Sequence, residues 1–374
     1  MDGSPLNTFR SLNFLVSLLL IMVTRVSGQH ADPAPSDPFP QVSFEGLFYL
    51  TYQMGEEDGE DYSKFAVTRS YFTTRVKLLP KLSARITMDG HQDDTGDVKV
   101  RLKYAYAEYD FGEWGALTKV GLKGGIVHMV WLDFEEHIDL YRMRDKMFME
   151  RSGMFNSADF GLTLAGGIGE DLPDEYKEEV NDHYAARYGS FAVGVYNGGG
   201  YHGSEQNEDK AVQGRLTVRP LPDVIPGLQL SGLAIIGEGN QEGEPDETPN
   251  WQAYNLMGSY QFPNGTVTAQ YAWGEGNQNG SWVEPTDESE ATNYGGYSLF
   301  GEYKIGPHWR LLGGLDDMDR TPGDSDLSFT RVHGGIGYDF GGQNILLFDL
   351  DRRNWDDSDR ETDTRFQVVM QVKF

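Results

Sequence analysis

The segment 129–156 has the clearest capacity for chemistry, because it mixes acids, bases and large apolar side chains in a short stretch. Loops of this length are usually functional or disordered, and disorder is not expected where aromatic residues are frequent. Its large apolar side chains are Trp131, Phe134, Ile138 and Tyr141. Such side chains need to be buried. We therefore expect the segment to fold inward rather than into solvent.

Covalent catalysis has little support in the sequence. His128 and His137 lie beside many carboxylates, but neither belongs to a nucleophile motif, so a hydrogen-bonding role is favoured. The acidic stretches 317–326 and 349–363 could bind Ca²⁺ through carboxylates, but they lack the fixed spacing of an EF-hand loop. We predict no catalytic residue, no metal site and no cofactor, and we interpret the two stretches as solvated loops.

A second group of residues is basic and lies in segments with the alternation of β-strands. Its members are Arg69, Arg75, Lys77, Arg85, Lys99, Arg101, Lys103, Lys119, Lys123, Arg215 and Arg219. Successive side chains of a strand point to opposite faces, so their spacing places these residues on one face. Rings of Lys and Arg line pores for anions. This face could therefore favour anions, or it could consist of solvated side chains paired with acidic loop residues.

The strand that ends the chain shows the alternation best. Phe366, Val368, Met370, Val372 and Phe374 alternate with mainly polar residues over about ten positions. Membrane β-barrels show this pattern because one face meets lipid and the other meets water. A strand of a soluble sandwich is the alternative. The terminal Phe374 resembles the last residue of bacterial outer-membrane proteins, and we interpret it as a membrane-assembly signal.

Sixteen segments of this kind predict an all-β fold, a 16-stranded antiparallel transmembrane β-barrel. The number is even, as a single-chain bacterial barrel requires. The expected strands are 41–53, 64–79, 82–90, 98–111, 117–128, 157–167, 183–197, 210–219, 227–237, 251–262, 265–275, 292–304, 307–317, 327–340, 343–353 and 363–374.

The connections alternate between tight turns and long acidic loops. Turns such as 79–81 and 263–264 are rich in Pro, Asn or Gly. Barrels of this kind have short periplasmic turns and long external loops, so both termini are expected in the periplasm. The connection 168–182 breaks the pattern, because it is long and falls on the periplasmic side. It is either a periplasmic excursion or a sign that the strand count is wrong by one hairpin.

The first residues predict export. A basic residue, an apolar stretch from Leu12 to Val23 and small residues indicate a cleaved signal peptide over 1–28. A Pro-rich lead-in over 29–40 and the barrel over 41–374 follow. The absence of Cys excludes a disulfide framework. The formal net charge of −27 argues against a nucleic-acid partner.

The segment 129–156 and the strand that follows it carry a family resemblance. The residues concerned are Trp131-Leu132-Asp133-Phe134-Glu135-Glu136-His137, Tyr141-Arg142, Phe148-Met149-Glu150-Arg151, Ser157-Ala158-Asp159-Phe160-Gly161 and Val195-Tyr196-Asn197-Gly198. In these motifs the chain resembles the phosphate-selective porin O and P family. The resemblance implies a trimeric porin in the bacterial outer membrane, in contact with membrane lipid and lipopolysaccharide. It also implies a third external loop that folds into the lumen and narrows the pore.

On that resemblance, acids and bases of the segment face each other across or along the constriction. The expected constriction residues are Trp131, Asp133, Glu135, Glu136, His137, Asp139, Arg142, Arg144 and Arg151. Opposed charges in a narrow passage would act on passing solutes more strongly than at a free surface. The alternative is that these charges pair with one another and only fix the loop to the wall.

The expected function is passive diffusion of small hydrophilic solutes and ions. The resemblance implies phosphate or other anions, whereas the acidic stretches 54–61, 238–247 and 351–361 would attract cations at low salt, so the sign of the preference stays open. Two other classes of protein stay open as well. One is a non-transporting adhesin or receptor with acidic loops that bind a partner or Ca²⁺, and the other is a small outer-membrane enzyme.

Overall fold

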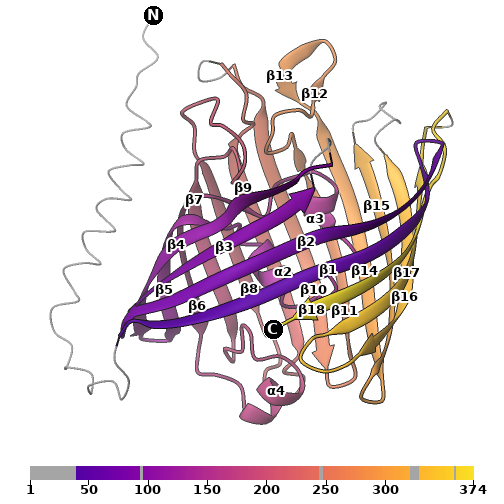
Figure 1. Ribbon diagram of the computed structural model, residues 1–374. Helices are drawn as coiled ribbons and strands as arrows, with labels where there is room; N and C mark the ends of the chain where they lie inside the picture. The colour runs from indigo at the N-terminus through magenta and orange to yellow at the C-terminus, as the bar shows by residue number, and fades with distance from the viewer. Residues whose placement is uncertain (1–38, 93–95, 244–246, 321–327, 358) are drawn as a thin grey trace, which may run out of the picture. The chain divides into compact units, whose positions relative to one another are not determined.

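The computed structural model describes residues 39–92, 96–243, 247–320, 328–357 and 359–374. The expected signal peptide and all of the lead-in before Phe39 lie outside these residues. Within them, sixteen antiparallel strands close into a barrel in which each strand pairs with the next and β1 pairs with β18. Figure 1 shows the ring of strands. The predicted fold class is confirmed.

The barrel strands are β1 (Gln41–Glu57), β2 (Glu60–Leu79), β3 (Leu82–Gln92), β4 (Val98–Trp114), β5 (Leu117–His128), β6 (Ala158–Ile168), β7 (Gly189–Tyr196), β8 (Ala211–Val218), β9 (Leu228–Glu238), β10 (Asn250–Phe262), β11 (Gly265–Glu275), β14 (Asn293–Ile305), β15 (Trp309–Arg320), β16 (Phe329–Asp339), β17 (Ile345–Trp355) and β18 (Asp363–Lys373). A separate hairpin consists of β12 (Val283–Glu284) and β13 (Asp287–Ala291).

Three segments differ from the sequence-based boundaries. Most of the expected loop 54–63 is strand, because β1 and β2 pair up to Glu57 and Glu60 across a tight turn at Asp58 and Gly59, both with positive φ. The expected loop 276–291 contains the hairpin β12–β13. The expected strand 183–197 begins only at Gly189. In the first two segments, charged and Gly residues hid strand pairing from the sequence pattern. In the third, the pattern suggested a strand over residues that the backbone hydrogen bonds leave outside β7.

The long connection between β6 and β7 is an excursion and not an error in the strand count. It holds the short helix α4 (Asp174–Glu179) and returns to β7, which pairs with β6 over its whole length. It lies at the same barrel end as the tight turns, including 80–81 and 263–264, as the connectivity requires. We call it connection 169–188.

The two faces of the strands differ in polarity. On β8, Gln213, Arg215 and Thr217 are buried, whereas Val212 and Leu216 are exposed. The same holds at β18, where Gln367 and Gln371 are buried and Phe366 is exposed. The apolar face therefore points out of the barrel and the polar face points in, as the alternation predicts.

Phe374 extends the β1–β18 pairing that closes the barrel. The backbone N–H of Gly46 donates to the carbonyl of Phe374 at 2.9 Å, and the N–H of Phe374 donates back to Gly46 at 3.1 Å. The Phe374 ring lies so close to Gly46 that a Cβ there would be 2.3 Å from its Cζ atom. Any other residue at position 46 would require the Phe374 ring to move. The role of Phe374 as an assembly signal stays a prediction.

The remaining helices, α2 (Leu132–Glu135) and α3 (Phe148–Arg151), belong to the connection between β5 and β6. Among the described residues, no helix is both long and apolar enough to cross a membrane. Trp131, Phe134 and Met149 of this connection are fully buried in one apolar cluster with Ile235 of β9 and Trp251 of β10. The connection therefore packs against the strands.

Candidate functional site

Residues 129–157, which we call the inward segment, contact the polar face of strands on several sides of the barrel. The hydroxyl of Tyr141 donates to Glu302 of β14 at 2.6 Å. The Arg151 guanidinium pairs with Asp316 of β15 at 2.5 Å. Figure 1 draws α2 and α3 among the barrel strands. These contacts hold the segment against the wall formed by β14 and β15.

A four-charge cluster attaches the middle of the inward segment to β16, β17 and β18. Arg331 of β16 lies 2.6 Å from Asp145 of the segment and also bonds Asp351 of β17. Arg365 of β18 completes the cluster at 2.8 Å from Asp351. Burial opposes ionisation of Asp145, but Arg331 and Arg365 hold the pKa of its carboxyl well below the ordinary value. The cluster thus stays charged and binds the segment to the wall.

The acids and bases expected to face each other across the constriction pair with each other. Arg142 lies 2.6 Å from Glu136 and 2.6 Å from Glu150. Arg144 lies 3.6 Å from Asp139. Burial opposes ionisation of Glu150, yet Arg142 lowers its pKa to about 2. These contacts match the alternative in which segment charges fix the loop.

The helix α2 is attached through two of the predicted carboxylates. Asp133 lies 3.6 Å from Lys123 of β5 and accepts a hydrogen bond from Tyr184 at 3.0 Å. Glu135 accepts bonds from the Trp131 indole at 2.8 Å and from Gln270 of β11 at 2.6 Å, without a basic partner among its described contacts. Burial raises the pKa of Glu135 to about 7.

The inner face of β2, β3 and β4 holds basic residues without carboxylate partners. The Lys103 ammonium donates to the Tyr71 hydroxyl at 2.7 Å, and Arg69 also bonds that hydroxyl. Arg85 donates to Thr87 at 3.0 Å and lies over the Tyr104 ring at 4.7 Å. Within the described part of the chain, none of these three cations forms an ion pair. Their positive charge is therefore not neutralised by direct contact.

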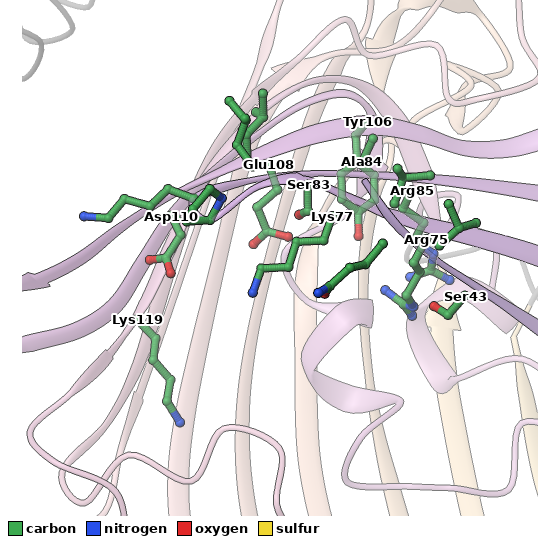
Figure 2. Close-up of a pocket in the computed structure, with 18 residues that line it drawn as sticks. Ser43, Arg75, Lys77, Ser83, Ala84, Arg85, Tyr106, Glu108, Asp110 and Lys119 are labelled. Atoms are coloured by element: carbon green, nitrogen blue, oxygen red, sulfur yellow. The ribbon is translucent and has the colours of Figure 1, made fainter. Parts of the chain in front are cut away.

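A recess of about 560 Å³ opens on the inner wall near the tight turns of β2–β5. Figure 2 shows Arg75, Lys77 and Arg85 pointing to the same side of the strands, with Lys119 at the far end. Arg75 pairs with Glu45 at 2.6 Å and Lys119 with Asp171 at 2.7 Å. Both pairs are about half exposed or more at the basic side chain, so they remain accessible to solutes.

Four predicted wall residues have other surroundings. Arg215 is buried beneath Phe134 at 4.4 Å and bonds Ser190 and Thr217. Arg219, just after β8, donates to the carbonyls of Ala186, Tyr184 and Pro226 and so ties two connections together.

The other two belong to β4. Arg101 pairs with Asp89 at 3.0 Å and lies over the Tyr201 ring. Lys99 is exposed and lies opposite His91 near the other barrel end. Whether Arg101 and Lys99 face a path for solutes stays a prediction.

Sequence reasoning missed the residues to which the inward segment is bonded. The main ones are Asp316 and Arg331, together with Asp351 and Arg365 on the neighbouring strands. Parity on the expected strands 327–340, 343–353 and 363–374 was a usable signal for Arg331, Asp351 and Arg365, since each adjoins an exposed apolar residue. Asp316, on the expected strand 307–317, lies between the half-buried Leu315 and Asp317 and gave a weaker signal. The contacts of Asn181 and Tyr184 carried no such signal because they lie in an irregular connection.

Comparisons with known proteins agree with the barrel. No protein-family model matches the sequence, and no curated protein matches it. Among solved structures, the chain is similar to an anion-selective porin from Comamonas acidovorans, with 11% identity, a TM-score of 0.63, and 90% of this chain and 100% of that chain covered.

Two further solved structures show the same architecture. Salmonella typhi OmpF, in complex with daunomycin, gives 13% identity and a TM-score of 0.62 over 90% of this chain and 98% of that one. The outer-membrane channel DcaP of Acinetobacter baumannii gives 10% identity and a TM-score of 0.60 over 90% and 97%. At these identities the likeness concerns the fold: the chain has the closed sixteen-stranded barrel of outer-membrane porins.

Proposed function

We propose that this protein is a porin of the bacterial outer membrane, through which small hydrophilic solutes and ions diffuse passively. The observation that carries the proposal is the division of charge inside the barrel. The bases of the inward segment are paired with carboxylates, whereas Arg69, Arg85 and Lys103 on β2–β4 are bonded to neutral groups. Charge that is not neutralised in a water-filled passage acts on solutes.

We propose that the inward segment narrows this pore. It is the third connection at the barrel end that carries the long loops, and its side chains bond the polar faces of β11, β14, β15 and β16. Space next to the basic wall is then the route for solutes. This supports the expectation of an inward third loop drawn from the sequence.

We further propose that the pore prefers anions, phosphate among them. The resemblance to the phosphate-selective porin family supports this, and one similar solved structure is an anion-selective porin. The exposed acidic residues of the loops oppose it, but their effect is screened over about 8 Å at physiological ionic strength. The unneutralised bases act within the passage itself, where screening is weaker.

The expected setting is the outer membrane, reached after removal of the signal peptide, with lipid and lipopolysaccharide around a homotrimer. The continuous exposure of apolar side chains on the outer face supports contact with lipid. Examples are Leu230 on β9, Leu256 on β10 and Val267 on β11, each at least half exposed. Trimerisation rests on the family resemblance and on the common fold.

Recording from the purified protein in a planar bilayer with a salt gradient tests the proposal. We expect discrete conductance steps and a reversal potential with the sign of anion preference. A variant that lacks residues 131–144 should conduct more, because the narrowing segment is gone. Steps of cation-selective sign would reject the anion preference alone. A correctly assembled protein without conductance would reject the porin function and favour the adhesin, receptor or enzyme classes.

Substitution on the outer face tests the contact with lipid. Val368 and Met370 lie on the outward face of β18, so replacing either with Arg should block assembly, at a cost of about 2–4 kcal/mol near the bilayer midplane. Phe366, on the same face but near the long loops, is the matched control, since the cost falls to about 0–1 kcal/mol near the interface. Equal assembly of all three variants would contradict a lipid-facing β18.

A further inference from the structure

Connection 169–188 contacts the inward segment from the opposite end of the barrel. The Asn181 amide donates to the carbonyl of His137 at 2.7 Å and to the Gln261 side chain at 3.1 Å. The Tyr184 hydroxyl donates to Asp133 at 3.0 Å, and its ring packs against Phe134 at 5.2 Å between centroids. A connection from the side of the tight turns therefore holds the end of α2.

Two histidines lie at the centre of this contact. The rings of His137, in the inward segment, and His183, in connection 169–188, are 4.0 Å apart with an interplanar angle of 31°. The His137 Nδ1 atom lies 2.6 Å from the carbonyl of Asp133. Two neutral imidazoles can stack at this distance, whereas two imidazolium rings repel each other.

The charged groups around the pair determine what protonation does. Asp182 lies 2.7 Å from the His183 Nδ1 atom and is mostly exposed, so it can stay paired with a protonated His183 after the contact opens. Asp133 faces the pair from α2, but it is already engaged by Lys123, by His128 and by the Tyr184 hydroxyl. Arg215 of β8 adds a positive charge over the Tyr184 ring at 5.0 Å.

Burial and the neighbouring His137 lower the pKa of His183. The closed contact therefore favours the neutral form of His183. A lowered histidine pKa means that the contact is more stable when the ring is neutral. This stabilisation is present above the ordinary titration range of histidine and is lost as the pH falls. The close packing of the two rings and the lowered pKa of His183 both favour the closed contact when His183 is neutral.

We propose that connection 169–188 positions the inward segment through the tilted ring contact between His137 and His183, and that positive charge on this pair at acid pH forces the two rings apart, releases the contact and widens the pore. The proposal rests on the proposed porin function. Asn181, His183 and Tyr184 are positioning residues, since they act on the passage through α2. Loss of the contact frees the end of α2, while the Arg331 cluster still holds the middle of the segment.

Single-channel recording at several pH values tests the inference. From about pH 7.5 to about pH 5, across the titration range of histidine, the wild type should spend more time in a state of higher conductance. We expect roughly a fivefold rise in that occupancy, the factor that corresponds to two unit charges about 4 Å apart in water. The His183→Gln and His137→Gln variants should lose the rise, and the double variant should lose no more than either single one.

Two further variants separate positioning from general stability. His308→Gln is the matched control, because His308 lies in the turn before β15 and contacts the backbone of Asp339. It should keep the wild-type pH profile. Tyr184→Phe removes the bond to Asp133 but keeps the ring, so it should raise the occupancy of the higher state already at neutral pH.

Three outcomes would overturn the inference. They are a pH-independent wild type, an unchanged profile in His183→Gln, and a profile that is lost equally in His308→Gln. Conducting channels with any of these results leave the porin function intact and reject only the pH-dependent contact. A wild type that assembles but does not conduct rejects the porin function and this inference together.

Discussion

Two regions of the inner wall both carry charged side chains but use them differently. On β14–β18, the bases and acids lie in direct contact with the inward segment, as Arg331 does with Asp145. On β2–β4, Arg69 and Lys103 share the hydroxyl of Tyr71. A carboxylate neutralises a base, whereas a hydroxyl satisfies its hydrogen bonds and leaves its charge. The first wall therefore holds the segment, and the second keeps bases without an ion-pair partner, which we propose act on solutes.

This difference teaches that charge alone does not identify a selectivity residue. A buried ion pair is a weak source of net stability, but removing one partner is costly because the other charge stays buried and unpaired. A base bonded to a phenol can be replaced by a neutral polar residue at little structural cost. Substitutions on β14–β18 should therefore lower stability more than they change selectivity. Substitutions on β2–β4 should change selectivity more than they lower stability.

The largest effect is expected for Arg331→Gln on the segment-holding wall. Only 2% of the Arg331 side chain is exposed, and its loss leaves Asp145 and Asp351 to share Arg365 as their remaining base in the cluster. We expect a loss of about 3–5 kcal/mol in stability together with higher and noisier conductance. Thermal unfolding and single-channel recording check this. The control is Arg352→Gln on the same strand pair, where Arg352 is exposed and bonds only Asn354 among the described residues. Equal melting of both variants would contradict the comparison.

A smaller, pH-dependent effect is expected for Glu135→Gln. Burial, with a contribution from Asp139, raises the pKa of Glu135 from 4.5 to about 7, so the folded protein binds a proton that the unfolded chain releases. Stability is therefore full at acid pH and falls as the pH rises through about 7. The wild type should melt at a lower temperature at alkaline pH, and the variant should lose this slope. The exposed Glu175→Gln on α4 should keep it. A variant with the wild-type slope would assign the titration to another group.

The sequence predicted the framework of this comparison better than its details. Strict alternation, as in 366–374, follows from a two-sided strand with one apolar face, and it predicted the sixteen strands. The apolar side chains of the inward segment predicted burial, and Trp131 and Phe134 are fully buried. These features depend on the local sequence pattern and on the contrast between apolar and polar side chains.

Partner choice could not be predicted in the same way. Nothing in the local pattern tells that Arg151 meets Asp316, which lies far along the chain, or that Lys103 meets a tyrosine instead of an acid. Those contacts depend on the register of several strands and on the path of an irregular segment. The two bulges on β2 and the one between Leu102 and Tyr104 on β4 shift that register locally. Whether each predicted site residue acts on solutes stays a prediction.

On β2–β4, Lys103→Gln should change selectivity more than stability if the proposed function holds. Its ammonium bonds the Tyr71 hydroxyl and lies 4.6 Å from the centre of that ring, and a Gln amide can still donate to the hydroxyl. We expect the reversal potential in a salt gradient to move toward cation preference, with a melting temperature close to wild type. The matched control is Lys123→Gln, whose partner is Asp133 on α2. That variant should lose stability, because Asp133 loses its basic neighbour. If Lys103→Gln and Lys123→Gln lost the same stability, the distinction between bases bonded to neutral groups and bases paired with the inward segment would fail.

The smallest effect is expected at Lys77 in the recess near the tight turns. Its side chain is exposed at this wide end, where salt reaches it freely, whereas Lys103 is almost fully buried. Exposed charges are screened beyond about 10 Å at 0.1 M salt and beyond about 3 Å at 1 M. Lys77→Gln should therefore lower the anion preference at low salt and leave it unchanged at high salt, while Lys103→Gln should act at both. Reversal potentials at two mean salt concentrations with the same ratio check this. If both variants lose their effect on the reversal potential at high salt, the surroundings of Lys103 and the recess at Lys77 are screened alike. The selectivity would then belong to the basic wall as a whole and not to the part around Lys103.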